Sequence, residues 1–348
     1  MTLQPDEKSA PRRAVVRIAV VVAIVLVAWY VLKDLPWDLV GAALTQVSAL
    51  EVLALLGLVV LRAFVAALPL NVLMPEVSPG QATRNDLAGN LVANFAPPPS
   101  DVGIRYAMFR SWHVNAAEAM ASLSLSALLF YAGRFGAPIM GFTLVLLTRR
   151  FDDQYLVMAA VATLVAVLIV AAIILLARAE RSAAWLGRRA ARAVSQVREV
   201  DPAAWESAMV KFHETVSARL QRGWAGAVLA VVGLLVLESL ILILCMRFVG
   251  VPPESVVAVE IAGALLITYP LNMLPFGGIV ILDGLILEIL MAQGGGAFEA
   301  QLAAGLVLWR AATLVTPFVL GAIVLLQWQR REGSGVSWRR SPEAQESG

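Results

Sequence analysis

The sequence is poor in the residues from which most metal, nucleophilic and redox sites are built. Its 348 residues include one cysteine, Cys245, and two histidines, His113 and His213, which lie a hundred residues apart. A single cysteine allows no disulfide framework and no thiolate metal cluster. Two distant histidines argue against a histidine-based metal or nucleophile site. We therefore expect no metal, no redox chemistry and no cofactor.

Charged residues are also scarce. Only 15% of the chain is charged and 59% is hydrophobic, with a mean hydropathy of +0.78, whereas about a quarter of the residues in soluble domains are charged. This composition indicates a polytopic membrane protein. The net charge of +2 is too small to suggest a nucleic-acid partner. The sequence has no Gly-x-x-x-x-Gly-Lys-Ser/Thr motif, which argues against ATP-driven pumping by this chain.

Six apolar segments are long enough to cross the hydrocarbon layer of a bilayer, which is about 30 Å thick. The predicted spans are 15–32, 52–72, 119–148, 156–177, 224–248 and 300–326. A further apolar segment, 87–96, has ten residues and is too short to span, so we interpret it as re-entrant. The expected fold class is an all-α, polytopic membrane helix bundle with re-entrant or broken helices.

The polar loop 178–222 divides the membrane region into two halves, 15–177 and 223–327. The loop carries nine Arg/Lys against five acids, so the positive-inside rule places it in the cytoplasm together with the tails 1–14 and 328–348. We expect a bacterial-type cytoplasmic (inner) membrane, with both termini in the cytoplasm.

One face of a predicted helix in this loop carries apolar side chains at three- or four-residue intervals: Trp205, Met209, Phe212, Val216 and Leu220. We therefore describe 178–222 as an amphipathic linker. Two interpretations remain open, namely a helix that lies on the membrane surface and a helix that packs on the cytoplasmic surface of the protein itself.

The second half contains a break inside an apolar region, at 271–283. Pro275 and the adjacent Gly277 and Gly278 interrupt any helix there. Hydrocarbon cannot satisfy the freed backbone groups, so a break at this depth survives only where it is packed in protein or lines a wet cavity. The break therefore predicts a pocket.

The first half repeats this pattern. An Asn-x-x-Pro sequence begins at Asn94 and again at Asn272, and each asparagine either caps the freed backbone or contacts a ligand. Arg134 follows Asn94 by 40 residues, and Arg310 follows Asn272 by 38. By the order of the predicted spans, the chain enters the segment at Asn94 from the cytoplasmic side of the membrane and the segment at Asn272 from the outer side. We therefore predict two inverted repeats whose broken segments meet near the membrane midplane.

Three arginines lie within predicted spans, where each costs about 2.5–3.5 kcal/mol on insertion unless partners or water compensate it. The first, Arg62, has two open interpretations: a structural ion pair with Glu238 or a functional site. Arg62 and Glu238 occupy equivalent places in the repeat, 32 and 34 residues before their asparagines. This equivalence is what a contact across a pseudo-twofold axis requires.

The other two, Arg134 and Arg310, each follow a helix break. We predict that they form an anion site, because the planar guanidinium fork suits a phosphate bidentately. The acids Glu260, Asp283 and Glu288 lie in the same apolar region. They either neutralise these arginines or bind a coupling proton.

The chain resembles the flippase-like transmembrane domain of lysylphosphatidylglycerol synthases. The likeness rests on Ser-Asp-Val-Gly-Ile-Arg-Tyr-Ala-Met-Phe-Arg at 100–110, Pro-Phe-Gly-Gly at 275–278 and Val-Leu-Trp-Arg at 307–310. Val280 stands where that family usually has a third glycine, and Asp283 where it usually has glutamate. The resemblance implies a lipid-handling domain that moves a charged phospholipid between leaflets. Only a short polar tail follows the last span, so we expect no aminoacyl-transferase domain and no enzyme activity.

The leading hypothesis is a flippase-like protein that binds and translocates a lipid with an anionic phosphate head group, either a phospholipid or a polyprenyl phosphate. The alternative is an accessory protein that binds such a lipid and presents it to a membrane-bound lipid- or glycan-modifying enzyme. An intramembrane enzyme is disfavoured because no nucleophile–base pair accompanies the acids. The candidate substrate-binding residues are Arg62, Asn94, Asp101, Arg105, Arg134, Asn272, Gly277, Gly278, Asp283 and Arg310.

Overall fold

The computed structural model describes residues 37–96, 100–148, 164, 167–168, 171, 202–274 and 278–331. Every regular element in this part of the chain is a helix, so the predicted all-α membrane bundle is confirmed. The predicted span 15–32 and nearly all of 156–177 lie outside the described residues.

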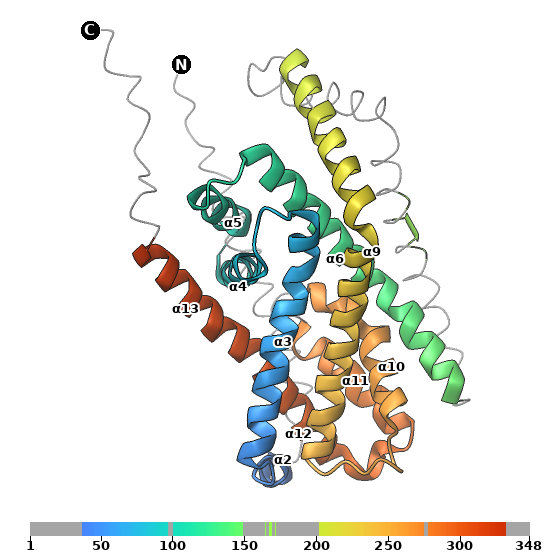
Figure 1. Ribbon diagram of the computed structural model, residues 1–348. Helices are drawn as coiled ribbons and strands as arrows, with labels where there is room; N and C mark the ends of the chain where they lie inside the picture. The colour runs from blue at the N-terminus through green and yellow to red at the C-terminus, as the bar shows by residue number, and fades with distance from the viewer. Residues whose placement is uncertain are drawn as a thin grey trace, which may run out of the picture.

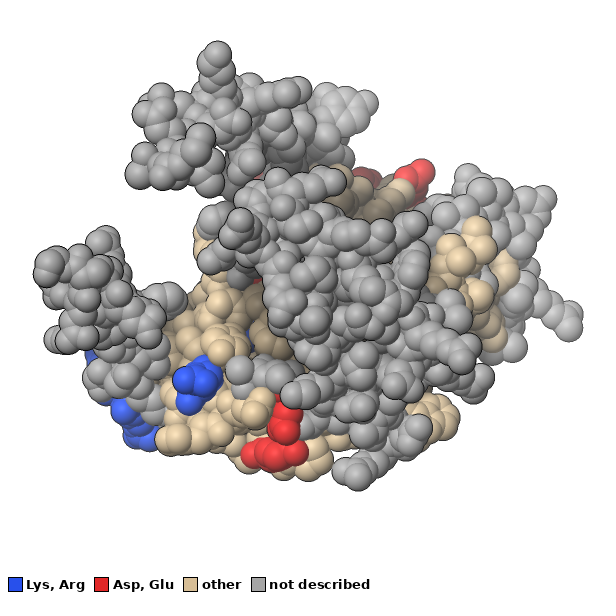
Figure 2. Space-filling view, turned by 90° about the horizontal axis from the view of Figure 1, so that it is seen from above, with Lys and Arg blue, Asp and Glu red and all other residues tan. Residues whose placement is uncertain are grey.

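Four helical segments of the described part are long and apolar enough to cross a membrane (Figure 1). They belong to α3 (Ala49–Leu73), α6 (Ala116–Thr148), α9 (Pro202–Phe248) and a composite helix. The composite consists of α12 (Glu299–Arg310), the π-helical turn η4 (Ala311–Val315) and α13 (Thr316–Arg331). These helices confirm the predicted spans 52–72, 119–148, 224–248 and 300–326. Viewed from above, charged side chains are sparse on the described surface (Figure 2).

The helix α9 runs through the boundary that the sequence placed between the linker and the fifth span. The predicted linker helix and the span therefore form one helix of 47 residues. A single glycine, Gly223, lies at the expected junction, and one glycine weakens a helix by only about 1 kcal/mol. A Cβ at Gly223 would lie 2.9 Å from Val72 Cγ1, so this glycine permits close packing of α9 on α3.

Three short helices belong to the first half. The helix α2 (Trp37–Leu44) lies between the predicted spans 15–32 and 52–72, and its residues Val40 and Ala43 are buried in the main core. The helix α4 (Pro79–Phe95) starts eight residues before the predicted re-entrant segment, because a capping box of Ser78 and Gln81 begins it. The helix α5 (Ser100–Ser111) packs beside α4, and both are seen nearly end-on in Figure 1.

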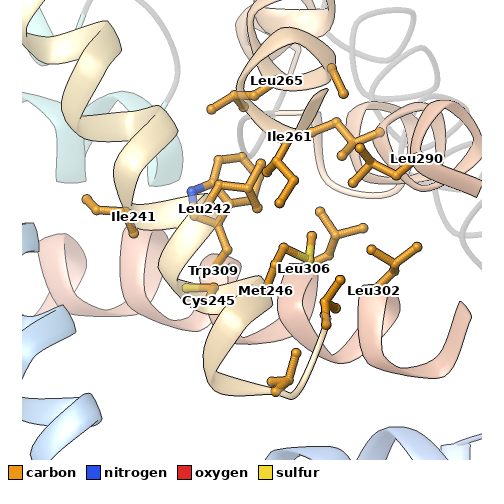
Figure 3. Packing of buried hydrophobic residues seen from close by; sticks show 14 of the residues in the cluster. Ile241, Leu242, Cys245, Met246, Ile261, Leu265, Leu290, Leu302, Leu306 and Trp309 are labelled. Carbon is orange, nitrogen blue, oxygen red and sulfur yellow. The ribbon is translucent and has the colours of Figure 1, made fainter. Parts of the chain in front are cut away.

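The second half contains the predicted break. The helix α10 (Ala258–Thr268) continues as the 3-10 turn η1 (Tyr269–Met273), and α11 (Ile281–Ala292) follows the break. A 3-10 turn, η3 (Gly295–Phe298), then leads into α12. Apolar side chains of α9, α10, α11 and α12 form the main core, in which Met246, Ile261 and Leu302 are fully buried (Figure 3).

Candidate functional site

A cavity of about 610 Å³ lies among the spanning helices, and both halves of the chain form its wall. Residues of α3, α4, α5 and α6 line it from the first half, and residues of α9, η1, η4 and α13 line it from the second. Six of the ten candidate residues lie on its wall: Arg62, Asn94, Asp101, Arg105, Arg134 and Asn272. The structure thus gathers most of the predicted site around one space.

The two Asn-x-x-Pro segments meet at this cavity. Asn94 lies at the end of α4 and Asn272 lies in η1, and both side chains belong to the lining. The Asn94 amide donates to the carbonyl oxygen of Asn90 at 2.8 Å, which fits a role in satisfying backbone at the helix end. The prolines of both motifs and Gly277 lie outside the described residues.

Arg105 ties α5 to α4. Its guanidinium donates to Asp86 Oδ1 at 3.1 and 3.2 Å and to Asn90 Oδ1 at 3.2 Å, while Asn85 Nδ2 donates to the Arg105 carbonyl at 2.9 Å. A Cβ at Gly89 would lie 2.1 Å from Arg105 Nε, so the glycine makes room for the guanidinium. Asp86 neutralises Arg105, and the network holds the two short helices together.

Arg62 lines the cavity and has a carboxylate partner, Glu238, that does not belong to the lining. Its Nε donates to Glu238 Oε1 at 2.6 Å, and its Nη2 forms an ion pair with the same oxygen. Glu238 is 2% exposed, and the Tyr269 hydroxyl donates to Oε1 at 3.5 Å. The ion pair expected from the repeat spacing is present, and it joins α3 to α9.

Arg310 and Asp283 form a separate pair that does not belong to the cavity lining. Arg310 Nε donates to the two carboxylate oxygens of Asp283 at 2.8 and 2.9 Å, and Nη2 approaches Oδ1 at 2.7 Å. The guanidinium also lies 4.5 Å from the centre of the Trp309 ring. Of the two roles considered for Asp283, the structure has it neutralise an arginine. Arg310 thus lies outside the cavity lining to which Arg134, its partner in the predicted anion site, belongs.

Gly278 is another candidate residue that lies beside the cavity wall without lining it. Its φ is +70°, and a Cβ there would lie 2.5 Å from the carbonyl oxygen of Leu271. Only glycine fits this turn without strain. Gly278 therefore shapes the backbone immediately after the break.

Arg134 differs from the other arginines of the site. It lines the cavity from α6, and among the described residues no acid pairs with it. Asp101 lines the same cavity from the first turn of α5, where the helix dipole favours a carboxylate. Since Arg62 and Arg105 already have acids, Arg134 is the guanidinium available to an anion.

Asp86 and Asn90 of α4 are among the polar wall residues that sequence reasoning missed. Together with Asn94 they recur at four-residue spacing on α4, so they share one face of that helix. Their side chains are linked, because Asn90 Nδ2 donates to Asp86 Oδ2 at 2.8 Å. This polar stripe was the signal that could have found them.

The comparisons with known proteins give one family. A family model described as the lysylphosphatidylglycerol synthase TM region matches residues 15–321. This range includes every residue of the cavity lining. No curated protein matches the chain.

Proposed function

Because the chain belongs to the lysylphosphatidylglycerol synthase TM-region family, and is thus a multi-pass membrane protein of a lipid-related family, we propose that its cavity binds a lipid with an anionic phosphate head group. We further propose that the protein moves this lipid between the leaflets of a cytoplasmic membrane in which both of its termini face the cytoplasm. The lipid is a phospholipid or a polyprenyl phosphate.

The observation that carries the proposal is the state of the three cavity arginines. Arg62 is neutralised by Glu238 and Arg105 by Asp86, whereas no described acid pairs with Arg134. An uncompensated guanidinium inside a membrane is costly, so it favours an anionic ligand. The planar fork of Arg134 matches two oxygens of one phosphate.

The remaining lining suits a lipid head group. A volume of about 610 Å³ falls in the usual range for small-molecule sites, roughly 300–1,000 Å³. Asn90, Asn94 and Asn272 supply donors for further phosphate oxygens, and Asp101 supplies an acceptor for head-group hydroxyl or ammonium donors. Exposed apolar side chains such as Met273 and Leu274 also line the cavity. The acyl chains of the bound lipid stay in the bilayer beside them.

Translocation is favoured over simple binding by the way in which the two halves share the cavity. Interrupted helices from both halves meet at the site, as in transporters whose substrate lies between two repeats near the bilayer midplane. The proposed inverted repeat has a further support in Gly141 and Gly321, which follow Arg134 and Arg310. Gly141 packs against α10 and Gly321 against α4, so each contacts a short helix of the other half.

Reconstitution of the purified chain in phosphatidylcholine vesicles tests the proposal. The probe is phosphatidylglycerol with a fluorescent acyl chain, and an external reductant reports its movement between leaflets. We expect Arg134→Gln to slow this movement roughly tenfold or more, since a hydrogen bond to a charged group contributes about 1.5–3 kcal/mol. Arg134→Lys should retain part of the rate.

The matched control is Arg84→Gln, because Arg84 is an exposed arginine of α4 outside the cavity lining. This variant should move the probe like the parent. A folded Arg134→Gln protein that also moves it like the parent rules out the Arg134 site. Arg134-dependent binding without movement supports the alternative function, in which the protein presents a lipid to a membrane-bound lipid- or glycan-modifying enzyme.

A further inference from the structure

A buried carboxylate directly behind the cavity wall has an unusual hydrogen-bond pattern. Glu238 lies in the spanning part of α9, one turn after the lining residues Leu234 and Leu235. All its bonds converge on one oxygen, since Arg62 and Tyr269 both donate to Oε1. The other oxygen, Oε2, is buried and has no hydrogen-bond partner among the described residues.

Buried carboxylates are normally satisfied on both oxygens, because an unpaired polar atom in a low-dielectric interior is costly. Oε2 therefore departs from that rule in a specific way. A proton can bind to Oε2 without displacing any existing donor from Oε1. Protonation would also remove the negative charge that holds Arg62.

Arg62 is placed to respond to such a change. Its side chain pairs with Glu238 and also belongs to the lining of the cavity. When the carboxylate is neutral, the guanidinium loses its counter-charge and an anion in the cavity becomes its best partner. The two arginines Arg62 and Arg134 can then act on the same ligand.

We propose that Glu238 is a proton-binding site coupled to anion binding in the cavity. A proton from water in the cavity binds to Oε2 when the anionic phosphate enters, and Arg62 transfers its ion pair from Glu238 to the phosphate. When the anion leaves, Arg62 pairs with Glu238 again and the proton returns to water. One proton is thus taken up with each anion, so a proton gradient across the membrane can drive movement of the anion. This inference rests on the proposed function of the same cavity.

Few other charges compete for this role. Arg134 of α6 interacts electrostatically with Tyr269, and Asp86 of α4 interacts with Arg62. Two further charged groups on helices packed on α9 have other partners, since Glu260 of α10 accepts from the Val257 amide and Arg310 of α12 pairs with Asp283. The thiol of Cys245 is buried two turns further along α9.

The coupling has a definite sign. Protonated Glu238 releases Arg62 for the ligand, so the affinity for an anionic lipid should rise as the pH falls. One coupled proton limits the change to about tenfold per pH unit. By reciprocity, binding of the anion should draw protons from the buffer.

Titration calorimetry on the detergent-purified full chain tests the proposal, with dioctanoyl phosphatidylglycerol as the probe. For the parent, the affinity should increase several-fold from about pH 8 to about pH 5, in line with one coupled proton. Buffers with different heats of ionisation should report proton uptake on binding. Glu238→Gln mimics the neutral acid, so it should bind as tightly as the parent does at low pH, without pH dependence and without proton uptake.

Glu288→Gln is the matched control, because Glu288 is an exposed acid of α11 outside the cavity lining. It should keep the pH profile of the parent. Binding that is present but independent of pH in the parent overturns the proton site and leaves the proposed function intact. Absence of binding at every pH overturns both. Should Glu238→Gln fail to fold, proton uptake by the parent on binding supports the proposal and zero uptake rejects it.

Discussion

The backbone amide of Val280 donates to Asp283 Oδ2 at 3.4 Å, and Val280 has a φ of +77°. A β-branched residue at positive φ is strained, at a cost of about 1–3 kcal/mol. Asp283 is in turn held by Arg310, which begins the π-helical turn of the last span. The strained turn after the break is therefore stabilised by a clamp from a distant helix.

The strain at Val280 gives the first prediction. Val280→Ala and Val280→Gly both remove the buried side chain, but only glycine relieves the positive φ. We expect the glycine variant to be more stable than the alanine variant by about 1 kcal/mol, measured by thermal unfolding in detergent.

The control for this comparison is Val59, which is fully buried in the regular helix α3. There the order should reverse, with alanine more stable than glycine by about 1 kcal/mol. The same order at both positions would contradict the strained turn. A more stable glycine variant would also agree with the glycine that the lysylphosphatidylglycerol synthase family usually has at this position.

The second prediction concerns the clamp itself. The side chains of Arg310 and Asp283 are 12% and 17% exposed, so removal of either leaves a charge that is largely buried. We expect Asp283→Ala to destabilise the protein by about 3 kcal/mol, the lower end for a broken buried pair. Arg310→Leu combined with Asp283→Leu should cost less than Asp283→Ala alone. A parent-like melting temperature for Asp283→Ala would show that the clamp contributes little.

The repeat pattern made part of the site predictable from sequence. The spacing paired Arg62 with Glu238, and the two Asn-x-x-Pro motifs predicted that Asn94 and Asn272 approach the same place, where both now line the cavity. Such features follow from motifs that recur in the sequence at similar spacings. They need no knowledge of which side chains compete for a given partner.

The choice of partner was not predictable. Glu260, Asp283 and Glu288 lie in the same apolar region of the sequence. Their spacing does not indicate which of them contacts an arginine. The structure selects Asp283, because it caps α11 where the last span passes. Arg310 lies outside the cavity lining, whereas Arg134 belongs to it. The continuity of α9 was not predictable either, because its first part lies in the polar loop 178–222 and its second part in an apolar span.

The third prediction tests the opposite orientation of the two halves. Gly80, near the start of α4, and Glu254, just before α10, are exposed. If the repeats are inverted, cysteines at these positions on a Cys245→Ser background should react with impermeant reagents from opposite sides of the membrane. Gly80→Cys should be labelled from the cytoplasm and Glu254→Cys from outside. Labelling of both from the same side would contradict the inversion.

The last prediction concerns the contact of α6 with α10. A Cβ at Gly141 would lie 2.8 Å from the backbone nitrogen of Ile267 and 2.9 Å from the carbonyl oxygen of Gly263. Backbone atoms cannot rotate away, so Gly141→Ala must push the two helices apart. Overpacking of this kind costs about 1–3 kcal/mol. The melting temperature should therefore fall.

The displacement should also reach the site, because α6 carries Arg134 and α10 leads into Tyr269 and Asn272 on the opposite wall. Gly141→Ala should thus weaken binding of dioctanoyl phosphatidylglycerol even at temperatures where the protein remains folded. Gly136→Ala is the control on the same helix, since a Cβ there meets nothing within 4 Å. That variant should match the parent in stability and binding. Equal behaviour of the two variants would mean that the separation of α6 from α10 does not set the geometry of the cavity.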